Sequence, residues 1–204
     1  MLEAASIDCE RGGRVLFRGL SFGLRPGELL RIAGANGQGK TSLLRILCGL
    51  LTPAAGEVRW DGERISSLRE EYSRRLVYIG HAPGVKDELS AAENLSITCT
   101  LAGMPAPASS IAQALERFGI PAATFLKRLS QGQRRRAALA RLALSESIPL
   151  WLLDEPLAAL DAAAASLMES LISGQVARGG MVVYTTHQET HVGGRILDLD
   201  ARHA

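Results

Sequence analysis

Short apolar runs alternate with amphipathic stretches along most of the chain. Five runs bounded by Gly, Pro or charged residues predict strands at residues 15–17, 29–33, 76–79, 150–153 and 181–185. Helical spacing of apolar positions, or richness in Ala and Leu, predicts helices at 41–50, 109–118, 132–144 and 162–176. The runs at 29–33 and 150–153 show no period-2 polarity, which is typical of strands covered on both faces. Strands that alternate with helices predict an α/β fold built on a parallel sheet.

The middle of the chain has a different pattern. Between residues 82 and 145 there is little strand signal, and helical stretches flank a segment with prolines at 105 and 107. We therefore expect a single domain over residues 1–204, with a core at about 1–81 and 146–204 and a helical subdomain at about 82–145 inserted between two parts of the sheet. A chain of 204 residues is long enough to bury one sizeable core and too short for two.

The composition is that of an ordinary globular protein, with 47% apolar and 22% charged residues. A net charge of +2 gives no strong field that would attract nucleic acid, and the arginines at 134–136 fit the solvated face of a helix. No apolar run reaches the roughly 18 residues that a transmembrane helix needs, and no signal-peptide pattern is present. We therefore expect any membrane association to come through a partner. Cys9, Cys48 and Cys99 form no C-x-x-C pair and are expected to be reduced thiols in the core.

A glycine-rich segment follows the apolar run at 29–33 and precedes a predicted helix. It has the pattern G-x-x-x-x-G-K-[ST] and consists of Gly34, Ala35, Asn36, Gly37, Gln38, Gly39, Lys40 and Thr41. Glycines let the backbone wrap a phosphate with its N–H groups, and the following helix adds the positive end of its dipole. Lys40 is then expected to reach the β- and γ-phosphates of ATP, and the Thr41 hydroxyl to bind Mg²⁺. The alternative, a plain glycine-rich turn, is disfavoured by the strand before it and the helix after it.

Two acidic residues, Asp154 and Glu155, end the apolar run at 150–153. The carboxyl end of a parallel strand faces the ligand crevice of such a sheet. We expect Asp154 to hold Mg²⁺ through water, and Glu155 to act as the general base that polarises the attacking water. Acidic pairs also occur at surface turns, so this prediction draws its strength from the glycine-rich segment.

The segment Leu129-Ser130-Gln131-Gly132-Gln133 precedes a predicted helix, about 20 residues before the acidic pair. The pattern L-S-x-G-Q at this place closely resembles the signature of ATP-binding cassette proteins. The resemblance implies a P-loop NTPase core with a parallel or mixed sheet and an inserted helical subdomain, with ATP and Mg²⁺ as cofactors. It also implies a head-to-tail homodimer, in which Ser130, Gln131, Gly132 and Gln133 bind the ATP of the partner subunit. Ser130 suits the N-cap position, and Gly132 permits close approach of the backbone.

The resemblance covers nearly the whole chain and assigns further roles. The segment Ala158-Ala159-Leu160-Asp161 resembles the loop that touches the partner subunit. His187, after Thr185-Thr186, stands where the family has a switch histidine that orients the attacking water at the γ-phosphate. Where the family has an aromatic residue that stacks on adenine, this chain has Arg11, whose guanidinium plane can also stack on a base. Where the family has a Mg²⁺-sensing glutamine, this chain has His81 or Ala82.

Four segments together resemble one branch of the family, the ATP-binding subunit of the haem exporter of bacterial cytochrome c maturation. They are Cys9-Glu10-Arg11, Gly80-His81-x-Pro83-Gly84-x-Lys86, Ala91-x-Glu93-Asn94-Leu95 and Thr185-Thr186-His187-Gln188. The resemblance implies an ATPase that energises haem export or the release of a haem-loaded carrier. It further implies a peripheral location at the cytoplasmic face of the bacterial inner membrane, through integral membrane permease subunits. We expect these subunits to dock near residues 81–88, because this stretch contains Gly and Pro and starts where the helical subdomain leaves the core; the alternative is an ordinary surface loop.

Three alternatives remain at this stage. The chain could be the motor of another importer or exporter of the same family. A soluble cassette ATPase that acts on DNA or ribosomes is disfavoured by the near-neutral charge and the lack of coiled-coil heptads. A P-loop kinase is disfavoured by the segment at 129–133 and by the lack of an evident phosphoryl-acceptor site.

Overall fold

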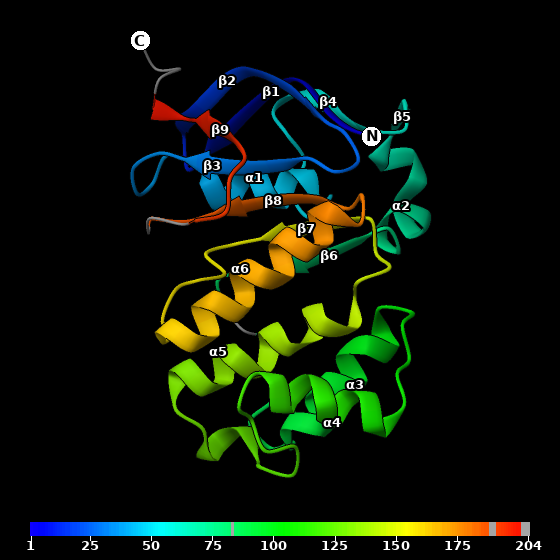
Figure 1. The fold of residues 1–204 in the computed structure, drawn as a ribbon. Coiled ribbons are helices and arrows are strands. Elements are labelled where there is room, and N and C mark those ends of the chain that lie inside the picture. Colours follow the sequence, from blue (N-terminus) through cyan, green and yellow to red (C-terminus); the bar gives the residue numbers. More distant parts are fainter. Residues whose placement is uncertain (83, 188–190, 201–204) are drawn as a thin grey trace.

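The computed structural model describes residues 1–82, 84–187 and 191–200, and in this part of the chain two β-sheets enclose a helix (Figure 1). The first sheet is antiparallel, with strand order β2-β1-β4-β5. Its strands are β1 (Leu2–Arg11), β2 (Arg14–Leu24), β4 (Ala55–Trp60) and β5 (Glu63–Arg64). The second sheet is parallel, with order β6-β7-β8-β3-β9. Its strands are β3 (Leu29–Ala33), β6 (Leu76–Ile79), β7 (Leu150–Leu153), β8 (Met181–Thr185) and β9 (Arg195–Asp198).

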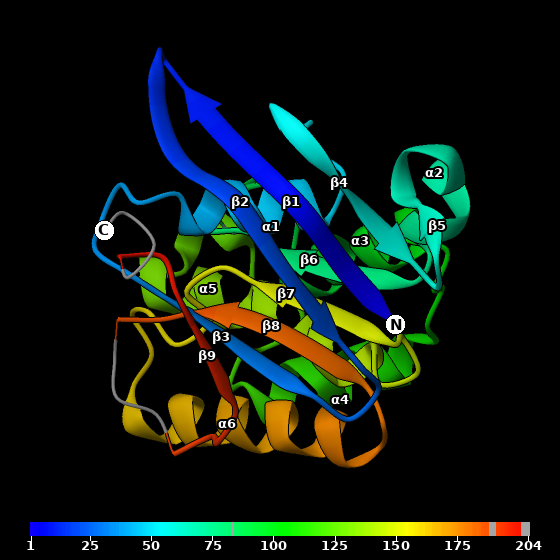
Figure 2. The ribbon, with the colours of Figure 1, turned by 90° about the horizontal axis from the view of Figure 1, so that it is seen from above.

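Helix α1 (Lys40–Leu47) lies between the two sheets, and in the view from above it is partly covered by β1 and β2 (Figure 2). Four of its apolar residues have 1% exposure or less, namely Leu43, Leu44, Ile46 and Leu47. They pack with the inner face of the antiparallel sheet and with Leu150 and Leu152 of β7 in one hydrophobic cluster. The first turn of α1, which follows the glycine-rich segment and contains its last two residues, Lys40 and Thr41, is therefore fixed by a core on two sides.

The other face of the parallel sheet is covered by α6 (Ala162–Ala177) and by the helices between β6 and β7. On β7, Trp151 and Leu153 point into this second cluster, whereas Leu150 and Leu152 point into the first. All four residues are fully buried. A strand that is apolar on both faces shows no alternation in sequence, which explains the uninterrupted run at 150–153.

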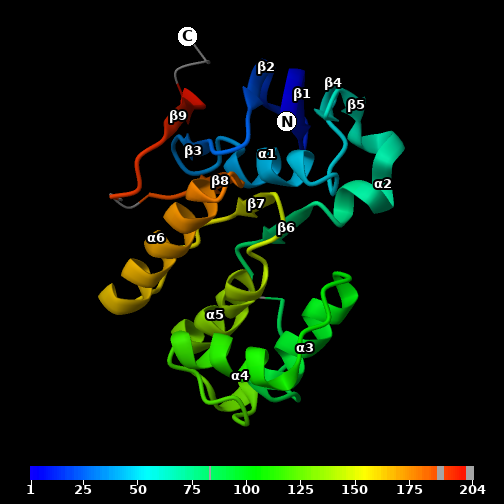
Figure 3. The same cartoon turned by 45° about the vertical axis from the view of Figure 1, so that its right-hand side comes forward.

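The segment between β6 and β7, which we call the helical region (residues 91–144), forms a group set apart from the sheets (Figure 3). It contains α3 (Ala91–Leu101), α4 (Ala108–Arg117) and α5 (Gln131–Leu139), with the 3₁₀ turns η1 (Leu126–Arg128) and η2 (Ala140–Leu144). Capping boxes start α3 at Ser90 with Glu93 and α5 at Ser130 with Gln133. A further helix, α2 (Ile65–Ser73), lies beside β4 and β5.

The predicted α/β class with a parallel sheet is confirmed. Strands β3, β6, β7 and β8 have the predicted bounds, and α1, α4 and α6 agree with prediction within a few residues. The helix predicted at 132–144 is α5 followed by the 3₁₀ turn η2. The strand predicted at 15–17 is part of the much longer β2, and β1, β4, β5, β9, α2 and α3 were not predicted individually. Within the described residues, no helix is both long and apolar enough to cross a bilayer.

Candidate active site

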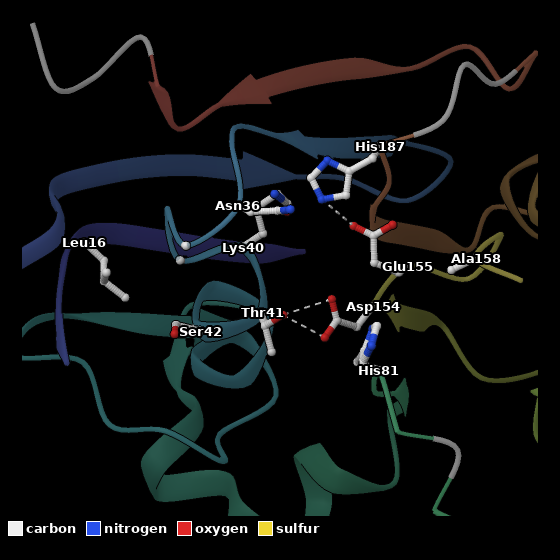
Figure 4. A pocket seen from close by; sticks show the side chains of 12 residues that line it. Leu16, Asn36, Lys40, Thr41, Ser42, His81, Asp154, Glu155, Ala158 and His187 are labelled. Carbon is white, nitrogen blue, oxygen red and sulfur yellow. Dashed lines mark hydrogen bonds and ion pairs between the residues drawn. The ribbon is translucent and has the colours of Figure 1, made fainter. Parts of the chain in front are cut away.

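Four neighbouring strands of the parallel sheet end at one edge, where their following residues surround an open cavity of about 520 Å³ (Figure 4). Lys40 and Thr41 come from the segment after β3, Asp154 and Glu155 follow β7, and His187 lies just beyond β8. The lining residues are Leu16, Asn36, Gly37, Gly39, Lys40, Thr41, Ser42, His81, Asp154, Glu155, Ala158 and His187. The carboxyl edge of a parallel sheet is the usual place for a ligand, because loops from successive strands converge there.

The glycine-rich segment has the backbone that phosphate binding needs. Gly39 caps α1 in a left-handed conformation, with φ of 97°, and no side chain caps this helix end. A Cβ at Gly39 would lie 3.0 Å from Phe17 Cε1, so only glycine fits without a shift. The Lys40 side chain turns back along the segment, and its Nζ donates to the carbonyl oxygens of Gly34 (2.7 Å) and Ala35 (3.0 Å). The ammonium and the free helix N-terminus thus face the same cavity.

Asp154 is 1% exposed and is held by two hydroxyl groups. Thr41 Oγ1 donates to its Oδ2 at 2.9 Å, and Thr185 Oγ1 donates to its Oδ1 at 3.0 Å. A carboxylate beside a threonine hydroxyl is an all-oxygen donor set, which fits Mg²⁺. The described residues contain no cluster of three or more His, Cys, Asp or Glu that could hold a metal. Mg²⁺ ordinarily uses one or two protein ligands together with substrate phosphates, so the pair Thr41 and Asp154 suffices for it.

Glu155 has a backbone φ of 52°, in the left-handed region that non-glycine residues rarely adopt. Its N–H donates to Thr185 Oγ1 at 2.8 Å, so the same hydroxyl orients both acidic residues. Its carboxylate points into the cavity, where Oε1 lies 3.2 Å from His187 Nε2 (Figure 4). The side chain of Glu155 is 15% exposed and that of His187 47%. A carboxylate and an imidazole in contact at a cavity can share a proton and orient a water molecule.

The structure brings together most of the residues predicted for one ATP site. Eight of them line the cavity, namely Asn36, Gly37, Gly39, Lys40, Thr41, Asp154, Glu155 and His187. Gly34, Ala35 and Gln38 belong to the same segment but do not line the cavity, and the Ala35 N–H donates to Asp200 Oδ2 at 2.8 Å. Arg11 is exposed at the end of β1 and is not among the lining residues. Its stacking on adenine stays a prediction.

The signature residues lie elsewhere. Ser130 caps α5, accepting from the Gln133 N–H at 3.3 Å, while Gln133 Oε1 accepts from the Ser130 N–H at 2.9 Å. A Cβ at Gly132 would lie 3.1 Å from the Ala159 carbonyl, so α5 begins close to the loop after the acidic pair. None of Ser130, Gln131, Gly132 and Gln133 lines the cavity. Their role toward the ATP of a second subunit stays a prediction.

Sequence reasoning gave no role to several residues at the site. Leu16 and Ser42 line the cavity, and Thr185 holds both Asp154 and Glu155. Thr185 could have been found from its place at the end of a predicted strand. Strand β8 pairs in parallel with β7, so the end of β8 lies beside the acidic pair that follows β7. Of the two places for the missing glutamine, His81 lines the cavity and Ala82 does not. Pro83 and Gln188, which were quoted for the resemblance, lie outside the described residues.

Comparison with known proteins bears on this arrangement. Residues 17–158 match a protein family described as ABC transporter. The chain is 50% identical to the cytochrome c biogenesis ATP-binding export protein CcmA of Aromatoleum aromaticum, over 98% of this chain and 95% of that protein. It is 49% identical to the protein of the same description in Nitrosospira multiformis, over 96% of each. The chain belongs to the ABC transporter family. Both resemblances drawn from the sequence, to ATP-binding cassettes and to their cytochrome c maturation branch, are confirmed.

Solved ABC cassettes share the fold of this family member. A putative ABC transporter ATP-binding protein from Pyrococcus furiosus superposes with a TM-score of 0.83 at 22% identity, over 98% of each chain. An ATP-binding cassette solved as a dimer in a post-hydrolysis state, bound to ADP and Pi, superposes with a TM-score of 0.84 at 23% identity. The latter match covers 97% of this ABC chain and 94% of the other. The two-sheet arrangement around α1 is therefore the ABC ATPase fold.

Proposed function

We propose that this ABC protein is the ATP-hydrolysing subunit of a transporter that serves cytochrome c biogenesis. Its ATPase activity would drive haem export or the release of a haem-loaded carrier. The observation that carries the proposal is the convergence of Lys40, Thr41, Asp154, Glu155 and His187 on one cavity. Support for the cytochrome c role comes from the relatives of about 50% identity, which are described as ATP-binding export proteins of that process.

Each residue has a role that its contacts support. Lys40 and the N–H groups at the start of α1 would bind the β- and γ-phosphates of ATP. Thr41 would ligate Mg²⁺ directly and Asp154 through water, and the metal supplies positive charge that neutralises the phosphates. Glu155 would accept a proton from the attacking water, and His187, which is 3.2 Å from it, would orient that water and donate to the γ-phosphate.

The proposal includes a head-to-tail dimer. The signature at the start of α5 lies outside the cavity, and residues 130 and 131 are exposed, so this surface is accessible to a second subunit. The N-terminus of α5 would then donate N–H groups to the ATP of the partner. One of the solved cassettes with this fold is itself a dimer with ADP and Pi.

A further part of the proposal is attachment to integral membrane permease subunits at the cytoplasmic face of the bacterial inner membrane. A second cavity of about 530 Å³ lies between the parallel sheet and the helical region, and we call it the interdomain groove. It is lined by Arg45, Tyr78, Ile79, Gly80, His81, Ala82, Gly84, Val85, Asn94, Leu95, Thr98, Ala137, Ala138 and Arg141. A mixed groove with apolar walls and two arginines suits a short amphipathic segment of a permease subunit.

The function is tested by two measurements on the same protein. Purified wild-type protein should hydrolyse ATP only with Mg²⁺ present. A strain whose gene is replaced by the Glu155→Gln variant should lose holocytochrome c, because the variant lacks the proposed base. If that strain made holocytochrome c at the level of the wild type but lost another transport activity, the protein would be the ATPase of a different transporter. A lack of Mg²⁺-dependent ATPase activity in wild-type protein would reject the proposal.

A further inference from the structure

The guanidinium group of Arg135 lies at the junction of three segments. Arg135 is on α5, five residues after the helix cap Ser130, and is only 5% exposed. Its Nη1 donates to the carbonyl oxygens of Gly80 (2.7 Å) and His81 (3.0 Å). Its Nη2 donates to those of Asp154 (2.7 Å) and Glu155 (2.9 Å). The four N–H groups of the two terminal nitrogens therefore have four acceptors, two after β6 and two after β7.

These contacts bear on the one active-site residue with a strained backbone. Glu155 has φ of 52°, and a left-handed non-glycine residue persists only where its surroundings over-determine it. Thr185 Oγ1 accepts from the Glu155 N–H, and Arg135 Nη2 donates to the Glu155 carbonyl. Both polar backbone groups of this residue are thus held, the N–H by β8 and the carbonyl by α5 together with the Ala158 N–H (3.1 Å). The conformation that they hold directs the Glu155 carboxylate into the cavity, toward His187 (Figure 4).

The other two contacts of Arg135, with the carbonyls of Gly80 and His81, lie where the chain leaves the sheet for the helical region. Gly80 and His81 leave β6 toward that region, and α5 itself begins with the signature segment. Because β6 and β7 are neighbours in the sheet, one planar guanidinium spans the ends of both. A shift of α5 relative to the sheet would lengthen the Arg135 bonds to Asp154 and Glu155 together.

Charge and shape both point to arginine at this place. Burial lowers the pKa of Arg135, and the nearby Asp154 and Glu155 carboxylates act in the opposite direction. Arginine stays protonated inside proteins, so the group remains a cation with its donors intact. Lysine carries a single point-like ammonium with three donors, which cannot reach four carbonyls on two segments.

We infer that Arg135 is a positioning residue for ATP hydrolysis, which holds the Glu155 backbone in its left-handed conformation and makes that conformation depend on the placement of α5. This inference deepens the proposed function and rests on it. Arg135 does not itself line the cavity, and it reaches the lining residues His81, Asp154 and Glu155 only at their backbone carbonyls, so it acts through their placement. A movement of the signature end of α5 would then change the position of the proposed base, Glu155, through the side chain of Arg135.

The test compares Arg135→Lys with Arg117→Lys, which changes an exposed arginine at the end of α4 in the same helical region. We expect Arg135→Lys to lower kcat by about tenfold to a hundredfold, because a small misplacement of a catalytic group has effects of this size. KM for ATP and the binding of a fluorescent ATP analogue should stay within about twofold, since the phosphate-binding groups are unchanged. Arg117→Lys should keep kcat near that of the wild type.

A double-mutant cycle separates positioning from a general loss of structure. If Arg135 acts through Glu155, single-turnover hydrolysis by Arg135→Lys/Glu155→Gln should equal that of Glu155→Gln alone. Multiplicative losses, an unchanged kcat, or a raised KM at constant kcat would each overturn the inference. If Arg135→Lys does not fold, Arg135→Gln is measured in the same way, and misfolding of both would assign Arg135 to the fold. Absent ATPase activity in the wild type would instead reject the proposed function itself.

Discussion

The charged side chains of the cavity are held by polar groups from several segments of the chain. The Lys40 ammonium is bound by two carbonyl oxygens of its own segment, and the Asp154 carboxylate lies between the hydroxyls of Thr41 and Thr185. Glu155 is oriented through its backbone. Since the hydrophobic clusters lie behind these groups, we expect conservative substitutions here to change the chemistry and to leave the fold intact.

Lys40→Ala should abolish Mg²⁺-dependent ATP hydrolysis, with a loss of at least about 100-fold in kcat. Among the described residues that line the cavity, Lys40 is the only Lys or Arg, so no other lysine or arginine there can join Mg²⁺ in neutralising the transferring phosphate. Phosphate release from purified protein measures the effect. Lys127→Ala, which removes an exposed lysine beside the Phe125 ring, is the matched control and should keep full activity. Turnover by Lys40→Ala at the rate of the wild type would refute the assignment of the site.

Glu155→Gln should slow hydrolysis and still bind ATP, and it should trap a dimer. The substitution keeps the shape of the side chain while it removes the base and one negative charge that faces the triphosphate. Gel filtration with ATP and Mg²⁺ should therefore show a species of twice the mass. Glu116→Gln, on the exposed side of α4, should behave as the wild type does. A Glu155→Gln protein that stays monomeric at high concentration would count against the sandwich dimer.

The helices and strands show which elements a sequence pattern can reveal. Continuous apolar runs predicted the buried strands β3, β7 and β8 with their observed bounds. Strand β1 was missed because its alternation breaks: Ala4 and Ile7 are both buried, and a register shift lies between them at Ser6, whose φ is 48°. Helix α3 was missed although its capping box, Ser90 with Glu93, follows a recognisable rule. Edge strand β9 has three exposed residues of four and carries little pattern.

The same limit applies to the site. Local motifs predicted most of the residues that line the cavity, because the phosphate-binding segment and the acidic pair are each continuous in sequence. The groups that hold them come from far along the chain, as with Arg135 on the Glu155 carbonyl and Asp200 on the Ala35 N–H. Such contacts depend on how the strands are ordered in the sheet, and no short pattern encodes that order.

The two capping boxes of the helical region allow stability to be separated from function. Ser90→Ala and Ser130→Ala each remove one side-chain cap, so each should lower the melting temperature by about 2–4 °C. Only Ser130→Ala should also reduce ATPase activity at saturating ATP, because Ser130 belongs to the signature proposed to bind the ATP of the partner. Thermal melts and phosphate release on both variants make the comparison. An equal loss of activity in both would assign the Ser130 effect to stability alone.

The two boxes also differ in their response to pH. Hydrogen bonds from the Ser90 hydroxyl and N–H lower the pKa of Glu93, so the charged form is favoured by folding. The contribution of this box is present above the unfolded pKa of Glu93 and is lost as the pH falls through the folded value. As the pH falls through this range, the loss of unfolding free energy caused by Ser90→Ala should therefore become smaller. The loss caused by Ser130→Ala should stay constant, because Gln133 does not titrate.

At the scale of the whole molecule, the interdomain groove lies beside the ATP cavity, and His81 lines both. The predicted docking segment, residues 81–88, runs from this shared residue toward α3, although Pro83 within it lies outside the described residues. Asn94 holds the second half of the segment, since its Oδ1 accepts from the Lys86 N–H (2.7 Å) and its Nδ2 donates to the Lys86 carbonyl (2.9 Å). The Lys86 side chain is exposed, so it can be changed without loss of these backbone contacts.

Lys86→Cys should therefore crosslink to a permease subunit in native membranes while basal ATPase activity stays that of the wild type. Burial raises the pKa of Cys9 and Cys99 and raises that of Cys48 to about 11, so the native thiols hold little thiolate at neutral pH and the new one reacts selectively. Water-soluble maleimide labelling of Lys86→Cys with and without the membrane subunits measures docking, and a cysteine at exposed Glu116, on α4, is the control. Equal labelling in both conditions would refute docking at this segment. If docking holds, substitutions at Val85 or Lys86 should abolish cytochrome c maturation and spare ATP hydrolysis, because Lys40, Thr41, Asp154 and Glu155 remain in place.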